Sequence, residues 1–187
     1  PADRDGFSAL NAAFAGEGTL IHVAKEMVSD TPVHLSHVVD AQGAGTMSHP
    51  RHVIVVERHA KATVVESYIG LANVAYFTNT VTEVVVEDGA TLNHSRIQRE
   101  AGSAFHVGTI EARQGRDSHF IQFSFQTGAR LSRSNVYTVL NGDRAASAEA
   151  RAKQAADTAK GAIDDATITA QVYAGLAKDP DLSAVKI

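Results

Sequence analysis

The chain has 187 residues, of which 44% are hydrophobic and 20% are charged, and its formal net charge is −4. This composition is typical of a folded globular protein, and the lack of a basic excess argues against a nucleic-acid or anionic-lipid binder. No apolar run approaches the roughly 20 residues of a membrane helix. Cysteine is absent, which excludes disulfides and any thiolate ligation of zinc or an iron–sulfur cluster by this chain alone.

The first predicted element is a short amphipathic helix. Phe7, Leu10 and Phe14 are spaced as on one helix face. Asp5 can cap the start of this helix and Gly16 can end it. We assign residues 1–18 to a helical entry segment.

Residues 19–143 have a different composition, with many runs of β-branched and aromatic residues. Runs of this kind predict β-strands. The clearest are Val53–Val56, Val84–Val86, Phe120–Phe125 and Val136–Leu140. No long helical stripe interrupts them, so we expect a mainly β domain.

Glycines divide this region at nearly equal intervals. Gly89, Gly102, Gly115, Gly128 and Gly142 are separated by 13, 13, 13 and 14 residues. About 13 residues suffice for a strand plus a corner, so two such units would form one coil of about 26 residues in a flattened parallel β-helix. The glycines should then lie at or beside the corners. An antiparallel sandwich, which also has frequent turns, is the alternative.

The C-terminal part is composed differently. Ala145–Ala162 holds nine alanines and almost no large apolar residue, which predicts a helical linker over residues 144–163. Beyond it, Ile168, Val172 and Leu176 form the apolar stripe of a further helix in the appendage at 164–187.

Seven phrases, in order, resemble the SufB/SufD family of iron–sulfur cluster assembly proteins over roughly residues 5–143. The wording of Ile97–Glu100 and Phe105–His106 is closer to the SufD branch than to SufB. The phrases are Phe7–Asn11 followed by Gly18–Val23, then His49–Val55, Ala62–Gly70, Thr78–Val86, Ala90–Glu100, Phe105–His106 and Gly128–Asn135.

The resemblance implies a right-handed parallel β-helix and a non-catalytic scaffold that works with SufB-like and SufC-like proteins. It implies an iron–sulfur cluster for the complex of the family, and no cofactor for this chain alone. In the family, the second half of the β-helix contacts SufB, and a C-terminal helical segment holds SufC. The resemblance ends at Asn141–Asp143, so no cluster ligand or ATPase-binding residue is carried over.

Two other functions remain open. Residues 164–187 resemble the opening of a BON domain, which suggests an envelope-associated interaction protein. A secreted carbohydrate-active β-helix enzyme would need clustered acidic and basic residues on one outer sheet, and usually a secretory signal. The residues at 1–5 lack the features of such a signal, and we expect a cytoplasmic protein.

The last coil, near Val136–Leu140, should present open strand edges and apolar core. Unpaired edges of this kind favour pairing with another chain. We therefore expect self-association through this end of the solenoid.

Nine histidines raise the question of a metal site. The pairs His34/His37 and His49/His52 have the spacing of helix neighbours, but they lie in strand-like sequence. The repeat places His94 and His119 on one sheet but facing opposite sides, and His106 on the other sheet. Surface or capping histidines are favoured; if a metal is held, His106 and His119 are the candidates.

Catalytic signatures are weak. Glu66, Glu83 and Glu100 lie in strand-like contexts, where outward alternation explains them. The chain lacks GxGxxG, GxxxxGK[ST] and GxSxG motifs. We predict that it has no catalytic site.

Overall fold

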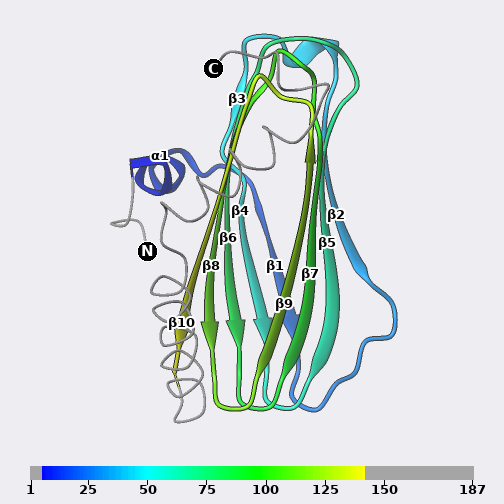
Figure 1. The fold of residues 1–187 in the computed structure, drawn as a ribbon, viewed down its shortest axis with the longest axis vertical. Coiled ribbons are helices and arrows are strands. Elements are labelled where there is room, and N and C mark those ends of the chain that lie inside the picture. The colour runs from blue at the N-terminus through cyan, green and yellow to red at the C-terminus, as the bar shows by residue number, and fades with distance from the viewer. Residues whose placement is uncertain (1–5, 142–187) are drawn as a thin grey trace, which may run out of the picture. The chain divides into compact units, whose positions relative to one another are not determined.

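The chain alternates between two parallel β-sheets, as a computed structural model describing residues 6–141 shows (Figure 1). Sheet A contains β1 (Gly18–Val23), β3 (Met47–Ser48), β4 (Arg51–Val56), β6 (Phe77–Val86), β8 (Phe105–Gln114) and β10 (Leu131–Leu140). Sheet B contains β2 (Val33–Val39), β5 (Lys61–Gly70), β7 (Thr91–Arg99) and β9 (His119–Thr127). A short 3-10 helix, η1 (Ala41–Gly43), follows β2.

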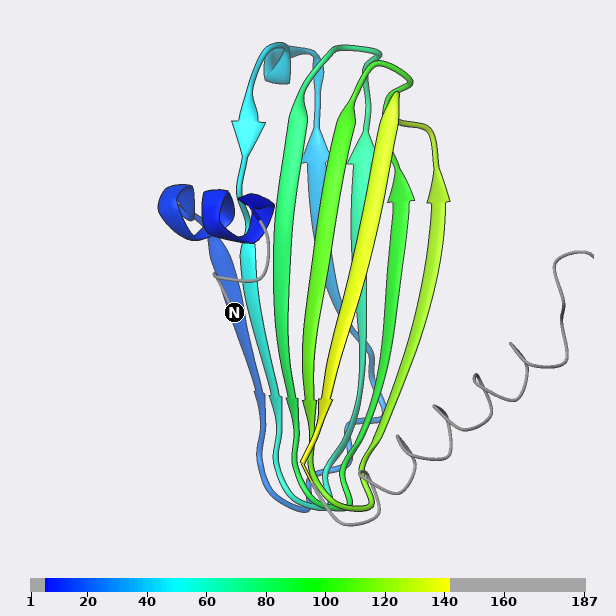
Figure 2. The same cartoon turned by 60° about the vertical axis from the view of Figure 1, so that its left-hand side comes forward.

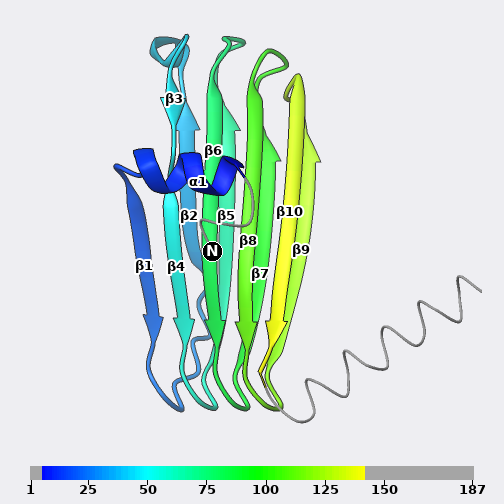
Figure 3. The same cartoon turned by 90° about the vertical axis from the view of Figure 1, so that its left-hand side faces the viewer.

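Successive strands of one sheet pair in parallel, and the chain passes through the other sheet between them. The order is β1-β4-β6-β8-β10 in sheet A, with β3 beside β6, and β2-β5-β7-β9 in sheet B. In Figure 3, the strands of sheet A run down in front, those of sheet B run up behind, and the chain advances from β1 towards β10. This is the path of a right-handed helix. The predicted parallel β-helix is confirmed, and the antiparallel sandwich is wrong.

The coils are not of equal length. Arg51 pairs with Val81 in the next coil, whereas Phe77 pairs with Phe105, a shorter step along the chain. Only the last repeat, from Phe105 to Leu131, has the predicted length. The predicted period is therefore wrong for the earlier coils, which are longer. Gly89, Gly102, Gly115 and Gly128 nevertheless all lie at or beside corners, outside the strands.

One corner position shows why the equal glycine intervals do not give the lengths of the coils. Glu26, His59, Gly89 and Asp117 all have positive φ, between 56° and 65°. These residues occupy equivalent positions, because the backbone amides of Glu26, His59 and Gly89 each donate a hydrogen bond to a carbonyl oxygen at the same corner of the next coil. Glycine meets this left-handed requirement without strain, but only one coil uses it. Gly115 precedes Asp117 in its turn and does not occupy this position, so equal glycine intervals do not mark equal positions.

Apolar side chains fill the solenoid where the strands of sheet A end and those of sheet B begin. Ile54, Val56, Val84, Val86 and Leu92 are at most 1% exposed there. Each buried side chain of this kind contributes roughly 1.5–3 kcal/mol. At the opposite corners, a smaller cluster contains Tyr76, Ala101 and Ala104.

Helix α1 (Gly6–Phe14) lies across the outer face of sheet A (Figures 2 and 3). The helix is confirmed, and Phe7 and Leu10 of its predicted apolar face are half-buried. The prediction is wrong for Phe14, which is 65% exposed, and the fully buried residues are the polar Ser8 and Asn11. The outer face of sheet A offers backbone carbonyl groups here: the Asn11 side-chain amide donates to the oxygens of Pro50 and Asn79, at 3.0 and 2.8 Å.

Two predicted segments lie outside the described residues: the linker at 144–163 and the BON-like appendage at 164–187. Within residues 6–141, no helix is long and apolar enough to cross a membrane.

Candidate functional site

Between the two apolar clusters, the interior of the solenoid is polar. Along β5 the inward-facing residues are Ala62, Val64, Glu66 and Tyr68, so the interior changes from apolar to polar within one strand. The neighbouring strands change in the same way, because parallel pairing keeps them in register. We call the inward-facing polar residues the polar belt: His37, His52, Glu66, Tyr68, Thr78, Thr80, Thr82, His94, Arg96, Gln98 and His106.

The centre of the polar belt is a fully buried ion pair. The Glu66 carboxylate and the Arg96 guanidinium are 0% and 1% exposed, and Arg96 Nη2 and Nε each lie 3.0 Å from Glu66 Oε2. Glu66 Oε1 accepts from Thr82 Oγ1 at 2.7 Å and from His94 Nε2 at 3.0 Å. The pair thus joins β5 and β7 of sheet B to β6 of sheet A.

These contacts decide the protonation of the belt. Burial by itself opposes a charge on Glu66, but the charge of Arg96 and the hydrogen bonds from His94 and Thr82 hold the pKa of this carboxyl well below its usual range. Burial, followed by the negative charge of Glu66, raises the pKa of the Tyr68 phenol above its ordinary value. Tyr68 therefore remains a neutral hydroxyl group, 2.8 Å from Thr80 Oγ1.

A second buried pair lies beside the first. His106 Nδ1 is 2.8 Å from Glu100 Oε2, and the Thr78 hydroxyl donates to Glu100 Oε1 at 3.1 Å. The His106 ring packs edge-on against Tyr68, with 4.9 Å between the ring centroids. The aromatic contact connects the two ionic groups into one layer.

Gly108 gives the Arg96 guanidinium its room. A Cβ at Gly108 would lie 2.6 Å from Arg96 Nη1 and 3.1 Å from His106 Nε2. Both distances are shorter than ordinary contacts, so a residue without a side chain is needed on β8 opposite the arginine. A glycine is needed beside the polar belt for a steric reason, since the φ of Gly108 is not positive.

Two further histidines face the same interior from the first coils. Burial lowers the pKa of His52 from 6.5 to about 4, against the opposing charge of Glu66. Burial lowers the pKa of His37 in the same direction. Both imidazoles are therefore neutral at pH 7.

The two histidines predicted as metal candidates are not brought together. His106 is buried inside sheet A, whereas His119 is exposed at the start of β9 in sheet B. The predicted opposition of His94 and His119 is confirmed, because only His94 faces inward. The preference for surface histidines is wrong for His52, His94 and His106, each 1% exposed. No group of three or more histidine, aspartate or glutamate side chains in residues 6–141 is arranged to hold a metal ion.

The outward orientation predicted for three glutamates holds only for Glu83, which pairs with Arg51 on sheet A. Glu66 and Glu100 are 0% and 7% exposed, so the prediction was wrong for both. The sequence contained the necessary signal for Glu66: it shares its alternation with Ala62 and Val64, which predicts the same inward face.

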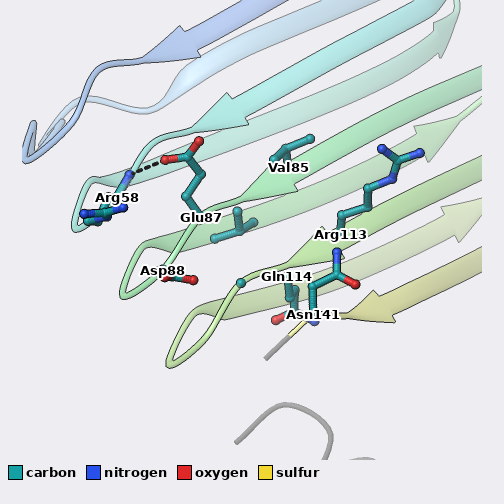
Figure 4. A pocket seen from close by; sticks show the side chains of 9 residues that line it. Arg58, Val85, Glu87, Asp88, Arg113, Gln114 and Asn141 are labelled. Carbon is teal, nitrogen blue, oxygen red and sulfur yellow. Dashed lines mark hydrogen bonds between the residues drawn. The ribbon is translucent and has the colours of Figure 1, made fainter. Parts of the chain in front are cut away.

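A surface pocket in residues 6–141 lies on the corner side of sheet A (Figure 4). It has a volume of about 370 Å³ and is lined by residues of successive coils, among them Arg58, Glu87, Asp88, Arg113 and Asn141. The Arg58 backbone amide donates to Glu87 Oε2 at 3.0 Å. Two arginines and two carboxylates leave this pocket without a strong net charge.

The centre of the polar belt is a closed cluster. Glu66, His94 and Arg96 are at most 1% exposed, and their charges and hydrogen bonds are directed at one another. A carbohydrate-active enzyme of this fold would need such residues on an outer sheet. Their place inside the solenoid disfavours that alternative.

Comparison with known proteins shows the family of the chain. The family described as "SUF system FeS cluster assembly, SufBD core domain" matches residues 37–169. A SufBD family iron–sulfur cluster assembly protein of Synechocystis sp. is 30% identical over 138 residues, covering 70% of this chain and 30% of that protein. The iron–sulfur cluster assembly protein SufD of Bacillus subtilis is 31% identical, covering 62% of this chain and 26% of its own length. SufD of Escherichia coli is 26% identical, and the match covers 73% of this chain and 33% of that protein.

The chain therefore spans about a third of the length of these relatives. No solved structure gives a significant match. The family match covers well over half of the chain; it begins within β2, includes every later strand up to β10 and extends to residue 169. The chain belongs to the SufBD core family of iron–sulfur cluster assembly proteins.

Proposed function

We propose that this chain is a non-catalytic scaffold component of a SUF-type iron–sulfur cluster assembly system. The observation that carries the proposal is the match of residues 37–169 to the SufBD core domain, supported by relatives named as iron–sulfur cluster assembly proteins. By resemblance, its partners are SufB-like and SufC-like proteins, and it works in the cytoplasm. With no cysteine, it supplies no thiolate, so the cluster belongs to the complex.

A scaffold role fits the way that charge is used. Glu66 and Arg96, the charged groups at the centre of the belt, are both buried and pair with one another at 3.0 Å. We infer that this layer fixes the register of neighbouring strands. Among the described residues, outward-facing side chains of β9 in sheet B are exposed.

One outer face is suited to a protein partner. Ile121, Phe123 and Phe125 occupy alternate positions of β9 and are 58%, 57% and 50% exposed. This apolar stripe lies on the last described strand of sheet B, beside strand edges that no other described strand covers. We propose that a SufB-like partner binds at this end.

The test is co-expression of the tagged chain with the SufB-like and SufC-like proteins of the same organism, followed by affinity capture. Capture of both partners in fixed ratio is expected. Phe123→Lys should weaken it, while Leu20→Lys, at a 69% exposed apolar residue on β1, should not. A folded chain that captures neither partner would contradict the proposal.

A further inference from the structure

The first coils contain two histidines that the ion pairs of the belt do not use. His37 on β2 and His52 on β4 face one another across the interior, with 4.9 Å between ring centroids and 47° between ring planes. Their sequence neighbours are directed elsewhere: the His34 ring contacts Ser67 Oγ at 2.7 Å, and His49 lies 3.3 Å from the Asn79 side-chain amide. The histidines pair across the two sheets, not along the strands.

Three of the four ring nitrogens of this pair are buried and lack partners. His37 Nε2 and both nitrogens of His52 are buried without a hydrogen bond. Each unsatisfied buried polar group costs about 1–3 kcal/mol, so a ligand that engages them is favoured. By contrast, His94 Nε2 is hydrogen-bonded to Glu66 Oε1 at 3.0 Å.

The protonation of the two imidazoles and the charges around them suit a cation. Both imidazoles are neutral at pH 7, the form in which histidine ligates metals. The negative charges of Glu66 and, for His37, of Glu17 act on these rings, and Arg96 opposes them. His37 is partly exposed, which gives access from the N-terminal end of the solenoid.

The separation of the rings also suits a cation. An ion about 2 Å from a nitrogen of each ring lies roughly 3 Å from each ring centre. Two centres 4.9 Å apart are closer than twice that distance, so one ion can be reached by a nitrogen of each ring once those nitrogens are turned towards it. The His37 ring is stacked on Tyr68 at 4.8 Å, with planes 9° apart, and this contact fixes one ligand in place.

We propose that His37 and His52 form a two-imidazole site for a divalent first-row cation such as Zn²⁺, with its remaining positions filled by water or an exogenous ligand. Two protein ligands are fewer than a structural zinc site has, so the ion should exchange readily. The site departs from the expectation that the chain alone binds no metal, and it does not depend on the proposed function.

The test is titration of the chelator-treated full chain with zinc chloride by calorimetry, with Co²⁺ absorption reporting coordination geometry. One equivalent should bind, and His37→Ala and His52→Ala should each weaken binding at least tenfold. His119→Ala, at an exposed histidine, is the matched control and should leave affinity unchanged.

Far-UV circular dichroism checks that each variant is folded, and His37→Gln serves if the alanine variants do not fold. Absence of zinc binding, or equal weakening in the His119 variant, would overturn the proposal. So would Co²⁺ spectra showing octahedral, water-only coordination.

Discussion

The buried Glu66–Arg96 pair should be strongly coupled in free energy of unfolding. Arg96→Met leaves a carboxylate buried with only His94, Thr82 and Tyr68 around it, and Glu66→Leu leaves an unpaired guanidinium. Each single change should cost about 3–5 kcal/mol, because it strands one buried charge. The double variant removes both charges and leaves mainly unsatisfied hydrogen-bonding groups, so the coupling should be at least about 2 kcal/mol.

Urea denaturation followed by circular dichroism gives the four free energies of the cycle. Arg96→Lys, which keeps the charge but loses the forked geometry, provides a milder variant if Arg96→Met unfolds the chain. The control cycle is Asp88 with Arg116, an exposed pair 3.9 Å apart, whose coupling should stay below about 1 kcal/mol. A Glu66–Arg96 coupling as small as that of the control would refute the role assigned to the belt.

The interior and its open end support three more predictions. Gly108→Ala should lower the free energy of unfolding measured in urea by about 1–3 kcal/mol, since the new Cβ would enter the space of the Arg96 guanidinium. Gly102→Ala, whose Cβ would meet nothing closer than 3.8 Å, should be nearly neutral, and equal effects of the two changes would contradict the steric explanation. The lowered pKa of His52 means that the unfolded chain binds the proton more readily between pH 6.5 and about 4, so stability should decrease as the pH is lowered through that window. At pH 5 the loss of unfolding free energy due to His52 should be about 1–2 kcal/mol, and this loss should be absent in His52→Gln. A variant with the same pH dependence of stability as the wild type would contradict the prediction. Light scattering should show dimers or larger species through the last coil, where inward-facing Val136 is still 46% exposed; a strictly monomeric chain would exclude this.

The solenoid could be predicted because its strands and corners have local sequence signals. Runs such as Val53–Val56 have no competing helical pattern, and corner glycines punctuate them. The coil length could not be predicted from glycine, because the left-handed corner position is filled by Glu26, His59 and Asp117 in the other coils. The hydrogen-bond ladder holds these residues in a conformation that their side chains disfavour.

The polar interior was harder to predict for another reason. A charged residue on a strand is usually outward, and this expectation outweighed the alternation that groups Glu66 with Val64. Its partner Arg96 lies on the next strand of sheet B, directly beside Glu66 in the register, and only the true length of the coil reveals this pairing. The facing of His37 and His52 depends on the spacing between two sheets, which no single strand encodes.

The most direct test of the central claim is deletion of the gene for this chain in its own organism. Activities of iron–sulfur enzymes should fall severalfold, activities of enzymes without clusters should be unchanged, and the wild-type gene should restore the loss. The Leu20→Lys variant should complement fully, and Phe123→Lys should complement less well. Unchanged iron–sulfur enzyme activities in the deletion strain, under conditions in which the wild type makes the protein, would contradict a role in cluster assembly.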